Sequence, residues 1–200
     1  MRGGELVEAL KVRALPEGSD DYDALVEFLR LYRDATQLVV NNLWSLNEVP
    51  SIKTLHKMFY NELRKHSFRA HHVKQIYVYA KAVVKASKQS GGKKPVLRRL
   101  TARIDRYDYR LDLESRTLIL KIHENREVRL KLLTSTKRIE KYKKWSNYEI
   151  AVKVVEDNVY VSVYFRRVVK PRKTRTVMTI DVNFDNATLA VFTSSGKLLK

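Results

Sequence analysis

The spacing of apolar and polar residues changes along the chain, and each change predicts a different kind of element. Residues 6–14 alternate with the period of a half-buried strand, with one apolar side and one basic side: Leu6, Leu10, Val12 and Ala14 against Lys11 and Arg13. Pro16 and Gly18 then interrupt the strand. The chain is therefore expected to begin with a strand and to change structure at residue 19.

Helical spacing follows, with Ser19 and Asp20 as candidate caps. A first helix of about 35–40 Å is predicted by one apolar stripe, consisting of Leu25, Phe28, Leu29, Tyr32, Ala35, Val39, Leu43 and Leu46. A second helix is expected after Pro50, with Ser51 as its cap and with Ile52, Leu55, Phe59 and Leu63 on one face. A third is expected over about residues 69–87, with Ala70, Val73, Tyr77, Ala80 and Val84. Together these segments predict a small helical bundle.

The segment "QSGGKKP", residues 89–95, marks a boundary, because two glycines and a proline break the helical spacing. Period-two alternation returns beyond it in five runs: Tyr107, Tyr109, Leu111 and Leu113; Leu118, Leu120 and Ile122; Val128, Leu130 and Leu132; Tyr148, Ile150, Val152 and Val154; and Val159, Val161, Val163 and Phe165. The turn at Asp157 and Asn158 joins the last two runs into a hairpin. The lysine-rich "KRIEKYKKW" between the third and fourth runs fits either a short helix or a loop.

These elements indicate an α+β fold. Alternating strands in a chain of 200 residues favour a small barrel or sandwich. The strand over residues 6–14 has no partner in the helical segment, and a strand left alone would expose its edge. We therefore expect it to pair with the later strands, with the helical bundle as an insertion.

The charge of the chain indicates which class of partner it binds. The chain carries 40 Lys and Arg against 22 Asp and Glu, a net charge of +18. The excess is concentrated: residues 91–144 hold 17 basic and 7 acidic side chains, and residues 164–176 hold six basic side chains and no acidic one. Such clusters attract polyanions, so nucleic acid is the expected partner. A charge run is also typical of a solvated face, and that reading stays open for "KRIEKYKKW".

The candidate phosphate contacts lie in the basic segments that flank the predicted barrel. They are Lys93, Lys94, Arg98, Arg99 and Arg103 on one side and Arg166, Arg167, Arg172, Lys173 and Arg175 on the other. Other classes are disfavoured. The absence of cysteine removes disulfides and zinc fingers, no apolar run reaches the length of a membrane span, and the N-terminus lacks a signal-peptide core. We expect a cytoplasmic protein with no membrane partner and no small-molecule substrate.

The last segment carries the most specific motif, "TIDVNFDNATLAVF" over residues 179–192. A strand from Val177 to Val182, a turn over residues 183–186 and a strand from Ala187 to Thr193 resemble the opening hairpin of an RNase H-like nuclease. Together with the preceding strand, helices and strands in this order, the chain resembles the N-terminal half of the OrfB transposon proteins, also called TnpB, which are relatives of type V CRISPR effectors. The segments "RAHHVKQIYVYAKAVVKA" and "KKPVLRRLTARI" are also similar to that family, as weaker signals.

The resemblance implies a division of the chain. Residues 1–17 and 91–175 correspond to a wedge-type β-barrel, residues 18–90 to an inserted helical recognition domain, and residues 176–200 to the start of a RuvC-like nuclease domain, expected to be truncated. It implies a transposase-type protein encoded by a transposon, an RNA-guided DNA endonuclease, with guide RNA and target DNA as its partners. Lys74 and Gln75 then become candidates for contacts near the DNA motif that the family reads.

The resemblance also implies that Asp181 is the first catalytic, metal-binding carboxylate of a Mg²⁺-dependent nuclease. Two metal ions held by several carboxylates stabilise both oxygens of a phosphodiester in such sites. The family's remaining Glu, its second Asp and its four-cysteine zinc ribbon have no counterpart in these 200 residues. We therefore expect this chain alone to bind nucleic acid without cleaving it and to hold no Mg²⁺.

Simpler readings accompany each of these residues. Asp181 could cap the turn with Asn183 and Asp185, although a calcium loop is excluded because Asn186 and Phe192 stand where Gly and Glu are needed. His71 and His72 are expected to be surface histidines rather than metal ligands. Trp44 and Trp145 could stack on bases, although core packing is the better interpretation for Trp44.

The alternative function for the whole chain is a non-enzymatic nucleic-acid-binding protein with an oligonucleotide-binding type of barrel.

Overall fold

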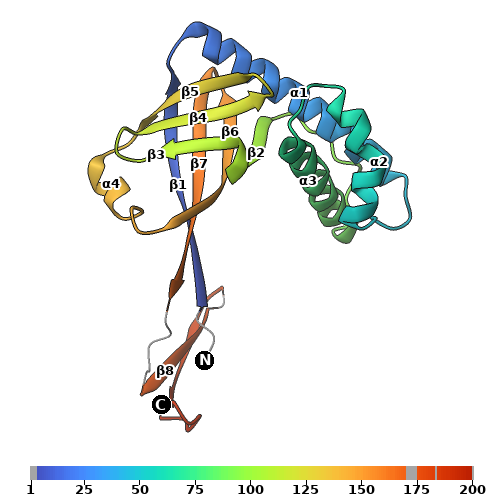
Figure 1. The fold of residues 1–200 in the computed structure, drawn as a ribbon. Coiled ribbons are helices and arrows are strands. Elements are labelled where there is room, and N and C mark those ends of the chain that lie inside the picture. Colours follow the sequence, from blue (N-terminus) through green and yellow to red (C-terminus); the bar gives the residue numbers. More distant parts are fainter. Residues whose placement is uncertain (1–3, 170–174, 183, 200) are drawn as a thin grey trace. The chain divides into compact units, whose positions relative to one another are not determined.

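The computed structural model describes residues 4–169, 175–182 and 184–199 and shows a mixed α+β fold (Figure 1). One compact unit spans residues 7–167, and residues 1–6 with 168–200 belong to a second. In chain order the elements are β1 (Gly4–Pro16), α1 (Ser19–Trp44), α2 (Ile52–Arg64), α3 (Ala70–Gln89), β2 (Leu100–Asp105), the 3-10 helix η1 (Arg106–Asp108), β3 (Tyr109–Asp112), β4 (Thr117–His123), β5 (Arg126–Leu133), α4 (Thr136–Glu140), β6 (Ser146–Val155), β7 (Asn158–Val169), β8 (Thr176–Val182) and β9 (Ala187–Thr193).

Seven of these strands form one curled antiparallel sheet, a half-barrel, in the order β2-β6-β7-β1-β5-β4-β3 (Figure 1). β1 lies between β7 and β5 and pairs antiparallel with β5, with Arg13 opposite Leu133. This confirms that the first strand joins the strands beyond the helices. The edge strands β2 and β3 are not neighbours in the sheet, but the Tyr109 hydroxyl donates to Asn147 Oδ1 at 2.9 Å and links β3 to β6.

The core of the half-barrel consists of the side chains that alternation predicts to point inward. Those of β4, β5 and β7 are all buried: Leu118, Leu120, Ile122, Val128, Leu130, Leu132, Val159, Val161, Val163 and Phe165. On β1 the prediction holds for Leu10, Val12 and Ala14, whereas Leu6 is exposed. The outward positions of the same strands are left for polar and basic side chains.

The three long helices pack together beside the half-barrel. The predicted stripe of α1 is buried from Leu25 to Leu43. Ser51 caps α2 as predicted, because its hydroxyl accepts from the Thr54 backbone N–H at 3.2 Å. At α1 the cap position is Gly18 instead of Ser19 or Asp20, and no side chain bonds there. The Tyr32 hydroxyl of α1 donates to the Arg103 carbonyl at 3.3 Å, which joins the helices to β2.

Two tyrosines depart from the predicted alternation. Tyr107 lies in η1 and is 59% exposed, because the Asp105 side chain accepts from its backbone N–H and turns the chain there. Tyr148 is the extra residue at a register shift between Asn147 and Glu149 in the β6–β7 pairing. An extra residue in one strand breaks the period of two, so Tyr148 is only half-buried and does not join the core. The start of "KRIEKYKKW" forms part of the short helix α4.

The second unit contains the predicted hairpin, β8 paired antiparallel with β9 from Thr176 to Val182. Its register places Asp181 opposite Thr188. Alternation puts Thr179 on the face of Asp181, and Met178, Ile180 and Val182 on the other face. Every described residue of β8 is exposed, and β9 is exposed from Ala187 to Leu189 and half-buried from Ala190 to Thr193.

Candidate nucleic-acid interface

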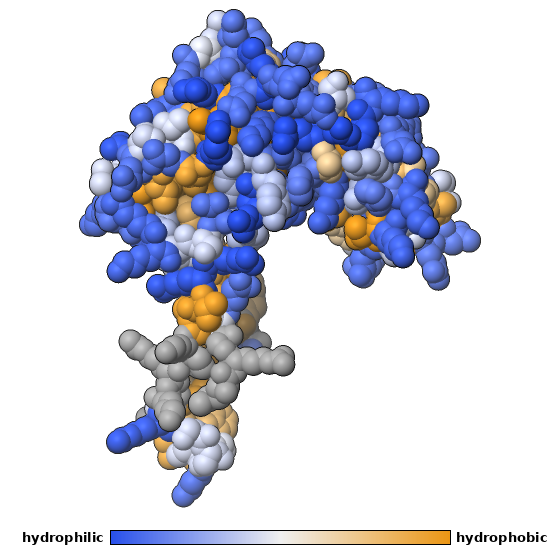
Figure 2. All heavy atoms as spheres, in the orientation of Figure 1, coloured by the Kyte–Doolittle hydropathy of each residue, from blue (hydrophilic) through white to orange (hydrophobic). Residues whose placement is uncertain are grey.

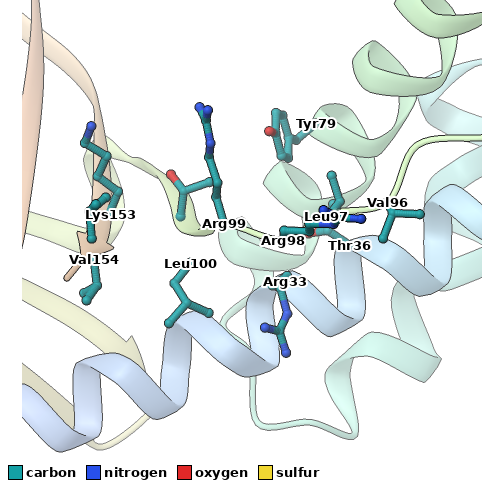
Figure 3. A pocket seen from close by; sticks show the side chains of 12 residues that line it. Arg33, Thr36, Tyr79, Val96, Leu97, Arg98, Arg99, Leu100, Lys153 and Val154 are labelled. Carbon is teal, nitrogen blue, oxygen red and sulfur yellow. The ribbon is translucent and has the colours of Figure 1, made fainter. Parts of the chain in front are cut away.

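A basic groove of about 670 Å³ lies in the 7–167 unit, where the helices meet the sheet (Figure 3). α1 and α3 supply one side, β6 supplies the other, and the segment that leads into β2 runs between them. The lining residues are Arg33, Thr36, Tyr79, Val96, Leu97, Arg98, Arg99, Leu100, Thr101, Lys153, Val154 and Val155.

Hydrogen bonds to α1 and α3 fix the segment that carries Arg98 and Arg99. The side-chain amide of Gln37 on α1 donates to the Pro95 carbonyl at 3.2 Å and accepts from the Leu97 backbone N–H at 2.7 Å. Ser87 of α3 donates to the Lys93 carbonyl at 2.8 Å. The two arginines therefore stand on a chain segment held at both ends, by these contacts and by the start of β2.

The groove is positively charged. Its lining includes four basic side chains and no Asp or Glu. Arg33 forms an ion pair with Asp34 at 2.8 Å, but Arg98, Arg99 and Lys153 form no ion pair with any described residue. In Figure 3, Arg99 and Lys153 extend to the same side as Tyr79, and Arg33 lies on α1 opposite them. Hydrophilic residues also cover most of the visible face of this unit (Figure 2). Such a surface favours a polyanionic ligand.

A second hollow, of about 290 Å³, adjoins the groove, since Tyr79 and Thr101 line both. Its other lining residues are Arg103, Tyr148, Ala151 and Tyr164. Arg103 donates to Glu149 Oε1 through Nε at 2.8 Å and Nη2 at 2.5 Å. Burial opposes the charged form of Arg103, but the bonds to Glu149 outweigh it and raise the pKa of the guanidinium.

Aromatic rings surround this second hollow. Tyr148 and Tyr164 lie with their ring centroids 6.3 Å apart and their planes at 43°. The Arg166 guanidinium lies over the Tyr148 ring, 5.5 Å from its centroid. Basic groups interleaved with aromatic rings are typical of nucleic-acid-binding surfaces.

The predicted phosphate contacts fall into three groups. Arg98, Arg99 and Arg103 line the two adjoining hollows, and Arg166 reaches them through Tyr148. Arg167 is not brought to this site, because it follows Arg166 on β7 and lies over the ring of Trp145, 4.5 Å from its centroid. Lys93 and Lys94 are exposed in the segment before the groove, Arg175 is exposed in the second unit, and Arg172 and Lys173 lie outside the described residues.

On α3, Lys74 is exposed and Gln75 is half-buried. Gln75 precedes Tyr79 by one helical turn, so it lies on the side of α3 that meets the groove. Among the basic and aromatic side chains that line the two hollows, sequence reasoning did not propose five: Arg33, Tyr79, Lys153, Tyr148 and Tyr164. The alternation of β6 and β7 could have indicated Lys153 and Tyr164, which fall on the outward positions.

Trp145 and His72 belong to the interior, and Trp44 lies at its edge. Trp145 is 9% exposed, and Trp44 is half-buried against the core with the Lys88 ammonium over its ring, 5.5 Å from the centroid. The prediction of a surface position is wrong for His72, which is fully buried beside Asp108. Its Nε2 lies 3.4 Å from Asp108 Oδ2 without hydrogen-bond geometry, and Arg69 Nε donates to Asp108 Oδ1 at 2.6 Å. Burial lowers the pKa of His72 to about 4, although Asp108 opposes this.

Asp181 is exposed on β8, as expected for a carboxylate without a buried partner. A magnesium site needs several oxygen ligands. In the described part of the chain, no three His, Asp or Glu side chains come close enough to hold a metal ion. The residues around Asp181 that the structure describes therefore do not form such a site by themselves, and we derive no reaction step from it.

Within the described ranges, none of the helices combines the length and the apolar character needed to cross a membrane. No protein-family model matches the chain, and no curated protein matches it. The resemblance to the OrfB family thus rests on the motif and on the order of the elements.

Proposed function

We propose that the chain binds nucleic acid through the groove between α1, α3 and β6, with Arg98, Arg99 and Lys153 as contacts to phosphates. The observation that carries this proposal is the set of lining side chains, which includes four basic residues and no acidic one. Three of those residues have no ion-pair partner among the described residues, so a phosphate would displace no internal ion pair, although the Lys153 ammonium also lies over the Tyr160 ring, 5.2 Å from its centroid. The net charge of +18 would draw a polyanion to this surface at low salt.

In this proposal the chain is the nucleic-acid-binding portion of a transposon-encoded, RNA-guided DNA endonuclease and holds guide RNA and target DNA. The half-barrel with its helical insertion between β1 and β2 supports it, since the family's wedge and recognition domains have this order of elements. The register of the β8–β9 hairpin, with Asp181 near the end of its first strand, suits the opening of a RuvC-like domain. Arg103 and Arg166 extend the phosphate-binding surface, and Lys74 and Gln75 face the DNA.

The binding test is a titration of structured RNA and of duplex DNA at several salt concentrations. Replacing Arg98 and Arg99 by Gln should lower the slope of log K against log salt by about 1.8 on duplex DNA, because each lost phosphate contact contributes about 0.9. The matched control is Lys53→Gln with Lys57→Gln, which removes the same charge from exposed positions of α2. Equal changes in both double variants would contradict the groove, and a wild-type slope near zero would remove the nucleic-acid proposal.

Asp181 is exposed, and the described residues around it form no group of metal ligands, which favours a second candidate, a non-enzymatic nucleic-acid-binding protein. The two candidates differ in whether DNA binding depends on the sequence of a bound RNA. An RNA-guided protein captures a DNA duplex only when a bound RNA carries a complementary segment. A simple binder captures DNA regardless of the sequence of the RNA. Pull-down of two DNA duplexes with one complementary and one scrambled RNA distinguishes these outcomes.

A further inference from the structure

We infer that the hollow between Tyr79, Tyr148 and Tyr164 receives an unpaired nucleobase. This inference rests on the proposed nucleic-acid binding and specifies what the site takes: a single-stranded or locally unpaired segment, with one base in the hollow and its neighbouring phosphates in the basic groove.

The register of the sheet explains why a hollow exists there. Across β2, β6 and β7, one row of outward positions consists of Arg103, Ala151 and Ser162. Two of these three side chains are small. The neighbouring rows are taller: Lys153 and Tyr160 stand on one side, and Glu149 and Tyr164 stand on the other. Ala151 of the small row and Tyr164 of a taller row line the volume of about 290 Å³, together with Thr101 and Arg103 of β2.

The bulge in β6 supplies one of the aromatic walls. Without the register shift between Asn147 and Glu149, the alternation of β6 would direct Tyr148 toward the core together with Ile150. With the shift, Tyr148 lines the same hollow as Ala151 and lies 6.3 Å from Tyr164 between ring centroids. Bulges often redirect a side chain to a functional position. Tyr79 adds a third ring from α3.

The polar groups at the hollow suit the edge of a base. Glu149 holds Arg103 through two nitrogens, so the guanidinium has a fixed orientation beside the rings. The hydroxyls of Tyr79 and Tyr164 make no hydrogen bond with the described residues, and both are available to donate or accept. Aromatic faces take any base, whereas these edge groups add a preference among bases.

Continuity with the groove identifies the ligand as a nucleotide strand. Tyr79 and Thr101 line both hollows, so a base among the tyrosines has Arg99 and Lys153 within the adjoining space for its phosphates. A base inside a duplex is stacked on both faces and paired along its edge, and it cannot enter. The geometry therefore favours an unpaired segment.

The test compares three ligands for the full chain by fluorescence anisotropy: a short single strand, a strand of equal length with abasic sites throughout, and a duplex. Tyr79→Leu and Tyr164→Leu should each weaken binding of the single strand about tenfold, the effect of losing a stacked base. Binding of the abasic strand and the duplex should change by less than about twofold, since they rely on phosphate contacts. Tyr164→Phe should keep most of the affinity for the single strand that Tyr164→Leu loses, because the ring remains and only the hydroxyl is removed.

Two further variants keep the test independent of folding. Ala151→Leu leaves the tyrosines in place and fills the hollow, and it should reproduce the selective loss. Tyr107→Leu is the matched control, since Tyr107 is 59% exposed and lies outside both hollows, and it should bind all three ligands as the wild type does. Equal losses for the normal and abasic strands, or no loss in any variant, would overturn the inference. A wild type without salt-dependent binding would instead overturn the proposed function.

Discussion

The half-barrel and the β8–β9 hairpin have the same alternation of apolar and polar residues, but they differ in what covers the apolar side. The inward side chains of β4 and β5, from Leu118 to Leu130, are 0% exposed. The corresponding face of the hairpin leaves Ile180 55%, Met178 58% and Val182 73% exposed. Alternation thus predicts which side chains share a face, but burial depends on whether enough strands and helices meet to enclose that face.

The same contrast distinguishes the candidate nucleic-acid contacts from the candidate metal ligand. Arg98, Arg99 and Arg103 stand on segments fixed by Gln37, Ser87 and the sheet, so their geometry is set before any ligand binds. Asp181 stands on a two-stranded ribbon in which every residue of β8 is exposed and no residue of β9 is fully buried. Preorganised groups bind with less loss of freedom. The side chains of the basic groove are accordingly more fixed in position than Asp181.

Amide hydrogen exchange should show the largest contrast between the two regions. Amides of β6 and β7 should exchange at least about 10³-fold more slowly than those of β8 and β9, because core strands open only by global unfolding and an isolated hairpin is marginally stable. Mass spectrometry of peptides after exchange in D₂O measures this. Similar protection in both regions would contradict the comparison and show that the apolar face of the hairpin is covered. Repeating the exchange at a tenfold lower concentration would reveal whether a second copy covers it.

Truncation of one buried and one exposed apolar side chain should give the next largest difference. Phe165 is 0% exposed and stacks on Tyr142 with ring centroids 4.5 Å apart. Phe165→Ala should lower the free energy of unfolding by about 3–5 kcal/mol, since it removes buried area and leaves a cavity. Ile180→Ala in the hairpin should change it by less than about 0.5 kcal/mol. Urea unfolding of the three proteins measures both values, and a large cost for Ile180→Ala would contradict the exposed setting.

Much of the half-barrel could be predicted from the sequence because its inward positions follow a strict period of two. Arg98, Arg99 and Arg103 could be proposed because they cluster along the chain. Arg33 could not be added to them, since α1 reaches the groove only through the tertiary fold, and the alternation of β6 predicts that Lys153 points outward but not that it lines the groove. The position of Tyr148 at the second hollow could not be predicted, because it depends on the bulge in β6, which no pattern in the sequence marks.

His72 shows a different limit of prediction. Adjacent histidines on an amphipathic helix are predicted to lie at the surface, but the packing of Phe28 against His72, with ring centroids 5.0 Å apart, places it inside. Its neighbours Arg69 and Asp108 join α3 to η1. A buried histidine whose environment depends on three elements can be recognised only from the fold.

The buried His72 should make the stability of the 7–167 unit depend on pH. Its pKa is about 4 in the folded protein and about 6.5 when unfolded, so between these values the unfolded chain binds the proton and the folded protein does not. Stability from this group is therefore present above about pH 6.5 and falls as the pH decreases, by about 2 kcal/mol between pH 7 and pH 5. Urea unfolding at both pH values should show this loss in the wild type and a smaller one in His72→Gln. An equal loss in the two proteins would assign the pH dependence to other groups.

The smallest effect should come from Asp181→Ala. Asp181 is exposed, it faces Thr188 across the hairpin, and the described residues provide no cluster of ligands around it. A single carboxylate binds magnesium weakly, because the ion keeps most of its waters. The variant should bind RNA and DNA within about twofold of the wild type, and its free energy of unfolding should change by less than about 0.5 kcal/mol, as for most exposed substitutions. The wild type should cleave neither single-stranded nor duplex DNA at millimolar magnesium or manganese, with or without RNA. Metal-dependent nicking that disappears in Asp181→Ala would contradict this, and it would mean that other side chains complete a carboxylate cluster around Asp181, with Asp185 or a second copy of the chain as the first to examine.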